Sequence, residues 1–162
     1  FLSSIGEKIS EEYAGKELHV ICILKGGVFF TCELVKHITV PVTHDFMAVS
    51  SYGDATVSSG RIKIIKDLDD SIEGKDVLIV EDIIDSGITL SKLVDILKER
   101  EPASVEICAL LNKPERRLAH VDAKYIGFEI PNEFIIGYGL DYAEKYRELP
   151  YVGVLKPEVY NK

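Results

Sequence analysis

The sequence is poor in cysteine, in positive charge and in long apolar runs, and each shortage excludes a class of protein. Its three cysteines, Cys22, Cys32 and Cys108, are an odd number without metal-ligand spacing, which argues against a disulfide framework or a structural zinc site. They lie in apolar runs, so we expect buried thiols. The 19 basic residues are outnumbered by 27 acidic ones, a net charge of -8, and such a field repels nucleic acid.

No apolar run reaches the roughly 20 residues needed to cross a bilayer, and the N-terminal residues lack the basic-then-apolar order of a secretory signal. We therefore expect a cytoplasmic protein that binds neither membrane nor nucleic acid. The 162 residues, 46% of them hydrophobic, are enough to bury one core, and a single domain over 1–162 is predicted. Because the first residue is Phe1 rather than Met, we also expect that native residues precede it.

Short apolar runs alternate with helical or polar segments, which indicates an α/β fold with a largely parallel central sheet flanked by helices. The run at 18–24 ends in Lys-Gly-Gly before a predicted helix at 28–37. The run at 77–80 ends in an acidic, glycine-containing turn before an amphipathic stretch at 90–97. The other predicted strands are 44–49, 61–66, 105–111, 125–126, 134–136 and 152–155.

The polar segment SSYGDATVSSG joins the predicted strands 44–49 and 61–66. It is too long and too rich in serine and glycine for a tight hairpin turn. Composition alone favours a disordered hairpin tip over a lid. Loops of this type also close over active sites, so a flexible lid is the alternative.

The segment VLIVEDIIDSGITL, residues 77–90, combines a buried strand, three carboxylates and a helix start. Ser86, Gly87 and Thr89 can offer N–H groups and hydroxyls to a phosphate at the helix N-terminus. Glu81 and Asp82 suit ribose hydroxyls or a hydrated Mg²⁺. Any four of these residues alone would fit an exposed turn and a helix cap equally well. The complete pattern favours a site for a phosphorylated sugar with a metal ion.

This segment resembles the 5-phosphoribosyl 1-pyrophosphate signature of type I phosphoribosyltransferases, in the form carried by the hypoxanthine-guanine branch. Four other segments resemble the same branch in order and spacing, so the resemblance covers nearly the whole chain. They are LKGG at 24–27, SSYGD at 50–54, NKPERR at 112–117 and EIPNEFIIGYGLDYAEKYRELPYVGVL at 129–155. The resemblance implies the type I phosphoribosyltransferase fold with a lid loop and a small hood formed by residues of about 124–162.

The resemblance also implies a reaction in purine salvage. The 5-phosphoribosyl group of 5-phosphoribosyl 1-pyrophosphate would pass, with Mg²⁺ as cofactor, to N9 of hypoxanthine or guanine. The products would be IMP or GMP and pyrophosphate, and xanthine stays open as a secondary substrate. Since oligomers are common in this family, a homodimer or homotetramer is expected.

For the phosphoribosyl donor, the resemblance assigns a role to each matching residue. Lys25 and Gly26 would hold pyrophosphate, in this family often beside a cis peptide, which here would join Leu24 to Lys25. Glu81 and Asp82 would bind the ribose hydroxyls and Mg²⁺. The 5-phosphate would be surrounded by Asp85, Ser86, Gly87, Ile88 and Thr89.

Three more residues would act on the donor. Arg147 would clamp pyrophosphate with its planar fork of donors, although an arginine in EKYRE is more often a surface ion-pair partner. Ser51 and Tyr52 would belong to the lid and exclude water from the reacting centre. Gly27 and Gly139 depart slightly from the family pattern, and both could alter local rigidity.

For the purine, the resemblance assigns a general base and four binding residues. Asp85 would face N7 and take the proton that the ring loses when N9 attacks the anomeric carbon. Lys113 would donate to the 6-oxo group, which disfavours adenine. Phe134 would stack on the purine, Ile135 would offer main-chain groups, and Asp141 would bind Mg²⁺ directly. Taken alone, Lys113 is more simply a solvated lysine and Phe134 a core residue.

Two rival functions follow from the same signature. One is a type I transferase for xanthine or another base, because specificity depends on a few contacts around Lys113, Phe134 and Ile135. The other is a regulatory module that binds the donor without catalysis and acts on transcription or RNA. Such a module should show a basic face or lack the base, whereas here Asp85 and Lys113 are present and the net charge is -8.

Overall fold

The computed structural model describes residues 1–51 and 61–161, which build a six-stranded sheet and a smaller two-stranded one. The strands of the large sheet lie in the order β3-β2-β1-β4-β5-β6, and every neighbouring pair is parallel except the antiparallel β2 and β3. Their bounds are β1 Leu18–Ile23, β2 Val42–Ser51, β3 Ile62–Lys66, β4 Asp76–Ile84, β5 Ser104–Asn112 and β6 Tyr125–Glu129. The predicted α/β fold with a largely parallel sheet is confirmed.

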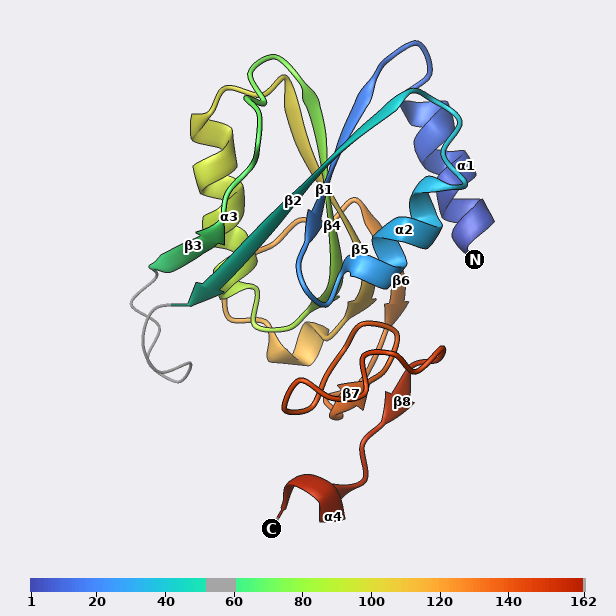
Figure 1. The fold of residues 1–162 in the computed structure, drawn as a ribbon, viewed down its shortest axis with the longest axis vertical. Coiled ribbons are helices and arrows are strands. Elements are labelled where there is room, and N and C mark those ends of the chain that lie inside the picture. Colours follow the sequence, from blue (N-terminus) through green and yellow to red (C-terminus); the bar gives the residue numbers. More distant parts are fainter. Residues whose placement is uncertain (52–60, 162) are drawn as a thin grey trace.

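Helices cover both faces of the large sheet (Figure 1). On one face, α1 (Leu2–Glu12) and α2 (Val28–Val35) bury Ile9, Phe30 and Leu34 against β1 and β4. On the other face, α3 (Ile88–Glu99) buries one stripe of leucines. The central strands are covered on both sides, which explains why all of β1 and residues 77–80 of β4 are buried without alternation.

The order of the strands determines where a ligand can bind. From β1 the chain passes to β2 on one side, and from β4 it passes to β5 on the other side. The turns that follow β1 and β4 therefore lie next to each other at the carboxyl edge of the sheet. This is the switch point where open α/β sheets bind ligands.

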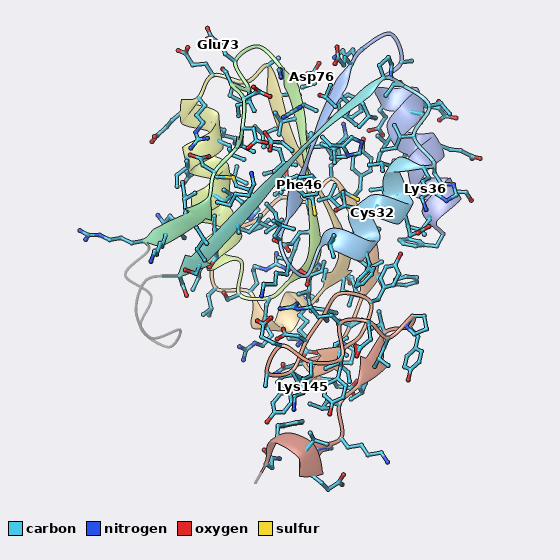
Figure 2. All side chains as sticks on the ribbon, in the orientation of Figure 1. Cys32, Lys36, Phe46, Glu73, Asp76 and Lys145 are labelled. Carbon is cyan, nitrogen blue, oxygen red and sulfur yellow. The ribbon has the colours of Figure 1, made fainter. Side chains whose placement is uncertain are left out.

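Several details of the chain differ from the sequence-based expectations. Helix α1 was not predicted, and β4 continues to Ile84 because its end pairs with β5. Cys22 and Cys108 are buried, but the prediction was wrong for Cys32, which is exposed (labelled in Figure 2). Helix α2 turns Phe30, Thr31 and Leu34 toward the core, and Cys32 lies on the opposite side.

The C-terminal part of the chain lies beyond the carboxyl edge of the large sheet (Figure 1). It contains the two-stranded antiparallel sheet of β7 (Ile135–Ile136) and β8 (Gly153–Val154), followed by α4 (Pro157–Tyr160). Of the residues predicted to form the hood, 125–129 are β6 of the large sheet. Within residues 1–51 and 61–161, no helix is both long and apolar enough to span a membrane.

We expect the stability of this fold to fall as the pH drops through the usual titration range of histidine. The His19 side chain is 4% exposed, its Nδ1 lies 2.7 Å from Thr43 Oγ1, and its buried Nε2 has no partner among the described residues. Burial, with Lys75 nearby, lowers the pKa of His19. As the pH falls through the unfolded-state pKa of about 6.5, the unfolded chain binds a proton that the folded chain resists, so unfolding becomes easier.

Urea denaturation of wild type and His19→Gln at pH values of about 7.5 and 5.5 tests this expectation. The wild type should lose more unfolding free energy than the variant between the two values. The other three histidines are common to both proteins and cancel in the comparison. An equal loss in the two proteins would contradict the role of His19.

Candidate active site

The turn after β1 brings the backbone against a carboxylate of β4. The Leu24–Lys25 peptide is cis, as the resemblance implies. A Cβ atom on Gly26 would lie 1.9 Å from Asp82 Oδ2 and 2.8 Å from its Cγ. Only glycine therefore allows this close approach, which places Gly26 beside Asp82.

The turn between β4 and α3 forms a small cavity of about 150 Å³. Five of the predicted site residues line it, namely Glu81, Asp85, Ser86, Gly87 and Thr89. The Ser86 carbonyl accepts hydrogen bonds from the backbone N–H groups of Leu118 (2.8 Å) and Ala119 (3.1 Å), which fix the turn. The cavity lies at the N-terminal end of the 12-residue α3, where the helix dipole favours an anion. Ile88 begins α3 but does not line the cavity.

Two neighbouring carboxylates, Glu81 and Asp82, lie near the end of β4. Asp82 is buried, and burial together with the Asp82 carboxylate raises the pKa of Glu81 well above its usual range. A cation or hydroxyl donors would relieve this repulsion, and carboxylates are suitable ligands for Mg²⁺. In the part of the chain that the structure describes, no three His, Cys, Asp or Glu side chains form a complete metal site. Other ligands of an ion held here would come from substrate or water.

A larger cavity of about 710 Å³ lies where the C-terminal part meets the carboxyl edge of the large sheet. Five predicted site residues line it, namely Asp85, Lys113, Phe134, Ile135 and Asp141. Lys113 is 8% exposed, and its backbone N–H donates to the Ile84 carbonyl (3.0 Å) at the end of β4. This cavity thus combines an aromatic wall, one buried cation and three carboxylates, those of Asp85, Glu133 and Asp141.

Two residues that sequence reasoning did not identify also line the larger cavity. The Tyr160 ring stacks on Phe134 with centroids 5.1 Å apart, and Arg116 Nε donates to Asp85 Oδ1 at 2.9 Å. Arg116 lies in the NKPERR segment, but nothing in the sequence indicated that it faces Asp85. Asp85 lines both cavities and therefore connects them.

A third group of residues joins the β1 turn to the C-terminal part. Arg147 Nη1 donates to the Gly139 carbonyl at 2.7 Å, and Gly139 packs directly on the Gly26 carbonyl. Lys25 and Arg147 both bind the carboxylate of Glu144, a third residue that sequence reasoning missed. These hydrogen bonds, first from Lys25 and then from Arg147, lower the pKa of Glu144. Two cations from distant segments are thereby brought together on one carboxylate.

Ser51, the one predicted lid residue that the structure describes, does not line either cavity. Ser51 is the exposed last residue of β2. Tyr52 lies outside the described residues. Their assignment to a lid stays a prediction.

Comparison with known proteins identifies relatives along nearly the full chain. The family model of the phosphoribosyl transferase domain matches residues 3–143. A hypoxanthine-guanine phosphoribosyltransferase of Streptococcus thermophilus is 55% identical over 158 residues, 98% of this chain and 88% of that protein. One of Bacillus subtilis is 54% identical over 159 residues, with the same coverage. The crystal structure of a hypoxanthine phosphoribosyltransferase from Staphylococcus aureus is similar with a TM-score of 0.96 and 50% identity, covering 99% of this chain and 88% of that one.

Proposed function

Because this chain belongs to the phosphoribosyltransferase family, we propose that it transfers the 5-phosphoribosyl group of 5-phosphoribosyl 1-pyrophosphate to hypoxanthine or guanine. The products are IMP or GMP and pyrophosphate, which makes the protein an enzyme of purine salvage. The observation that carries the proposal is the position of Asp85, which connects the small cavity to the large one. A carboxylate at this junction faces both a phosphoribosyl group and a base.

The larger cavity suits a 6-oxopurine. Phe134 supplies a ring face for stacking, and Ile135 offers backbone groups at the same wall. The buried Lys113 is a cation that has only donors, so it pairs with a 6-oxo group and rejects a 6-amino group. This chemistry favours hypoxanthine and guanine over adenine, and xanthine stays a proposed secondary substrate.

The chemical step joins the two cavities. Purine N9 attacks C1′ of the ribose, the N9–C1′ bond forms, and the bond from C1′ to the pyrophosphate oxygen breaks. The ring gives up its N7 proton to Asp85, which acts as the general base. Arg116 Nε also donates to Asp85 Oδ1, which holds this carboxylate at the junction of the two cavities.

The donor is proposed to span the small cavity and the β1 turn. Its 5-phosphate is bound by Ser86, Gly87, Ile88 and Thr89 at the start of α3, and its pyrophosphate by Lys25, Gly26 and Arg147. Glu81 and Asp82 bind the ribose hydroxyls. We propose Glu81, Asp82 and Asp141 as ligands of Mg²⁺. Since the described residues hold no group of three such side chains around one position, Glu81 with Asp82, and Asp141, would each bind the metal together with oxygens of the donor or water. Mg²⁺ would neutralise the charge that develops on the leaving pyrophosphate.

We further propose that the protein forms one domain with a C-terminal hood and a lid that includes Ser51 and Tyr52, and that it assembles as a homodimer or homotetramer. The cytoplasm is the proposed location because the multiply charged donor does not cross bilayers.

The test is nucleotide formation with Mg²⁺, the donor and each of hypoxanthine, guanine, xanthine and adenine in turn, for wild type and Lys113→Met. We expect turnover of the 6-oxopurines and none of adenine. Loss of a charged hydrogen bond should lower kcat/KM for hypoxanthine by about 10- to 100-fold in the variant. The matched control is Lys92→Met, which makes the same substitution at an exposed lysine. Wild-type turnover of adenine equal to that of hypoxanthine, or an unchanged kcat/KM in Lys113→Met, would contradict the proposal.

A further inference from the structure

The carboxylate of Glu144 lies between the two cations proposed to bind pyrophosphate. Lys25 Nζ donates to Glu144 Oε2 at 2.9 Å, and Arg147 Nη2 lies 3.3 Å from Oε1 and 3.4 Å from Oε2. Lys25 and Glu144 come from segments far apart in the sequence. Their side chains are 68% and 64% exposed, so both face solvent where a ligand could arrive.

Glu144 is presented by a strained turn in the C-terminal part, where its neighbour Lys145 is labelled in Figure 2. Tyr142 and Lys145 exchange two backbone hydrogen bonds of 3.0 Å across this turn. The two central residues have positive φ, 51° for Ala143 and 68° for Glu144. Positive φ at both central positions defines a type I′ turn, which normally carries asparagine and glycine there. Side chains with a Cβ disfavour this backbone, so the turn is not explained by local preference.

The contacts of Glu144 supply a reason for the strained turn. Its backbone N–H donates to Asp141 Oδ2 at 2.8 Å, and its carboxylate binds Lys25 and Arg147. The turn is therefore held in place by contacts to residues of the candidate site itself. An anion that competes for the two cations would remove the side-chain part of this support.

We propose that the Glu144 carboxylate takes the place of a phosphate between Lys25 and Arg147 and competes with pyrophosphate for these two cations. This inference rests on the proposed function, which assigns those cations to pyrophosphate. Solvent-exposed ion pairs contribute little, so a ligand with several negative charges can displace the carboxylate. When pyrophosphate is to leave, the carboxylate returns to the cations and favours release.

The test is calorimetric titration of inorganic pyrophosphate with Mg²⁺ into wild type, Glu144→Gln and Glu144→Gly, with no purine present. Gln keeps the shape of the side chain without its charge, and Gly removes the side chain while suiting the type I′ turn. Both variants should bind pyrophosphate about two- to fivefold more tightly, the size of one surface ion pair, and the gain should shrink as salt increases. The control is Glu148→Gln, which changes the net charge equally at an exposed residue of the same segment.

Unchanged or weaker pyrophosphate binding in both Glu144 variants would overturn the inference, because a residue that only positions the cations should weaken binding when it is removed. If Glu148→Gln also binds pyrophosphate more tightly, the gain comes from the change in net charge rather than from Glu144. This result would overturn the inference as well. Failure of the proposed function is detected separately, as the absence of nucleotide formation by wild type with hypoxanthine or guanine.

Discussion

Replacing Asp85 with Asn should lower kcat for hypoxanthine by about 10²- to 10⁴-fold, the usual contribution of a general base. Asn has nearly the same shape as Asp and can still fill the junction of the two cavities. It cannot accept the proton that the purine ring must lose. Because the Asp85 side chain is 48% exposed, the substitution should leave the fold intact.

Steady-state kinetics of wild type and Asp85→Asn, with hypoxanthine and the donor varied in turn, measure this effect. The matched control is Asp95→Asn, which removes the same charge from an exposed position of α3 that makes no ion pair with any described residue. The KM of the donor should change less than kcat, since Asp85 acts mainly on the base. If kcat of Asp85→Asn stays within about threefold of wild type, Asp85 is not the base.

Replacing Gly139 with Ala should destabilise the protein and weaken donor binding together. Gly139 has φ of 104°, and a Cβ there would lie 2.1 Å from the carbonyl oxygen and 3.1 Å from the carbonyl carbon of Gly26. The backbone strain alone is about 1–3 kcal/mol. The clash is with backbone atoms, so the β1 turn that carries Lys25 and Gly26 must also move. Gly139 is thus required here, although it departs slightly from the family pattern.

Thermal unfolding and the KM of the donor report the two parts of this prediction. The melting temperature should fall by about 2–4 °C for each kcal/mol lost, and the KM of the donor should rise. Gly15→Ala is the control, because Gly15 has φ of 79° and a Cβ there would meet nothing within 4 Å. Gly15→Ala should lower the melting temperature through backbone strain but leave the KM of the donor unchanged. Equal effects of both substitutions on stability and on KM would mean that the Gly139–Gly26 contact does not matter.

The parts of this protein that sequence reasoning predicted well depend on short-range physics. The buried run LHVICI of β1 and the glycine turn after it are recognisable because apolar residues and glycine act locally. The amphipathic stripe of α3 was predicted for the same reason. Helix α1 was missed, although Ile5 and Ile9 have helical spacing. It is anchored at its end by Glu12, which accepts a hydrogen bond from Tyr125, 113 residues away.

The fold class, the family resemblance and the residue types that the chemistry requires can all be predicted from the sequence. All of these are encoded in contiguous segments whose spacing can be read directly. Three contacts were not predictable in this way and depend on the folded chain: Asp85 connects two cavities, Arg116 donates to Asp85, and Glu144 binds both Lys25 and Arg147. These contacts join segments separated by up to 119 residues. Their partners are set by the strand order and by the packing of the C-terminal part on the sheet, and no local pattern records either.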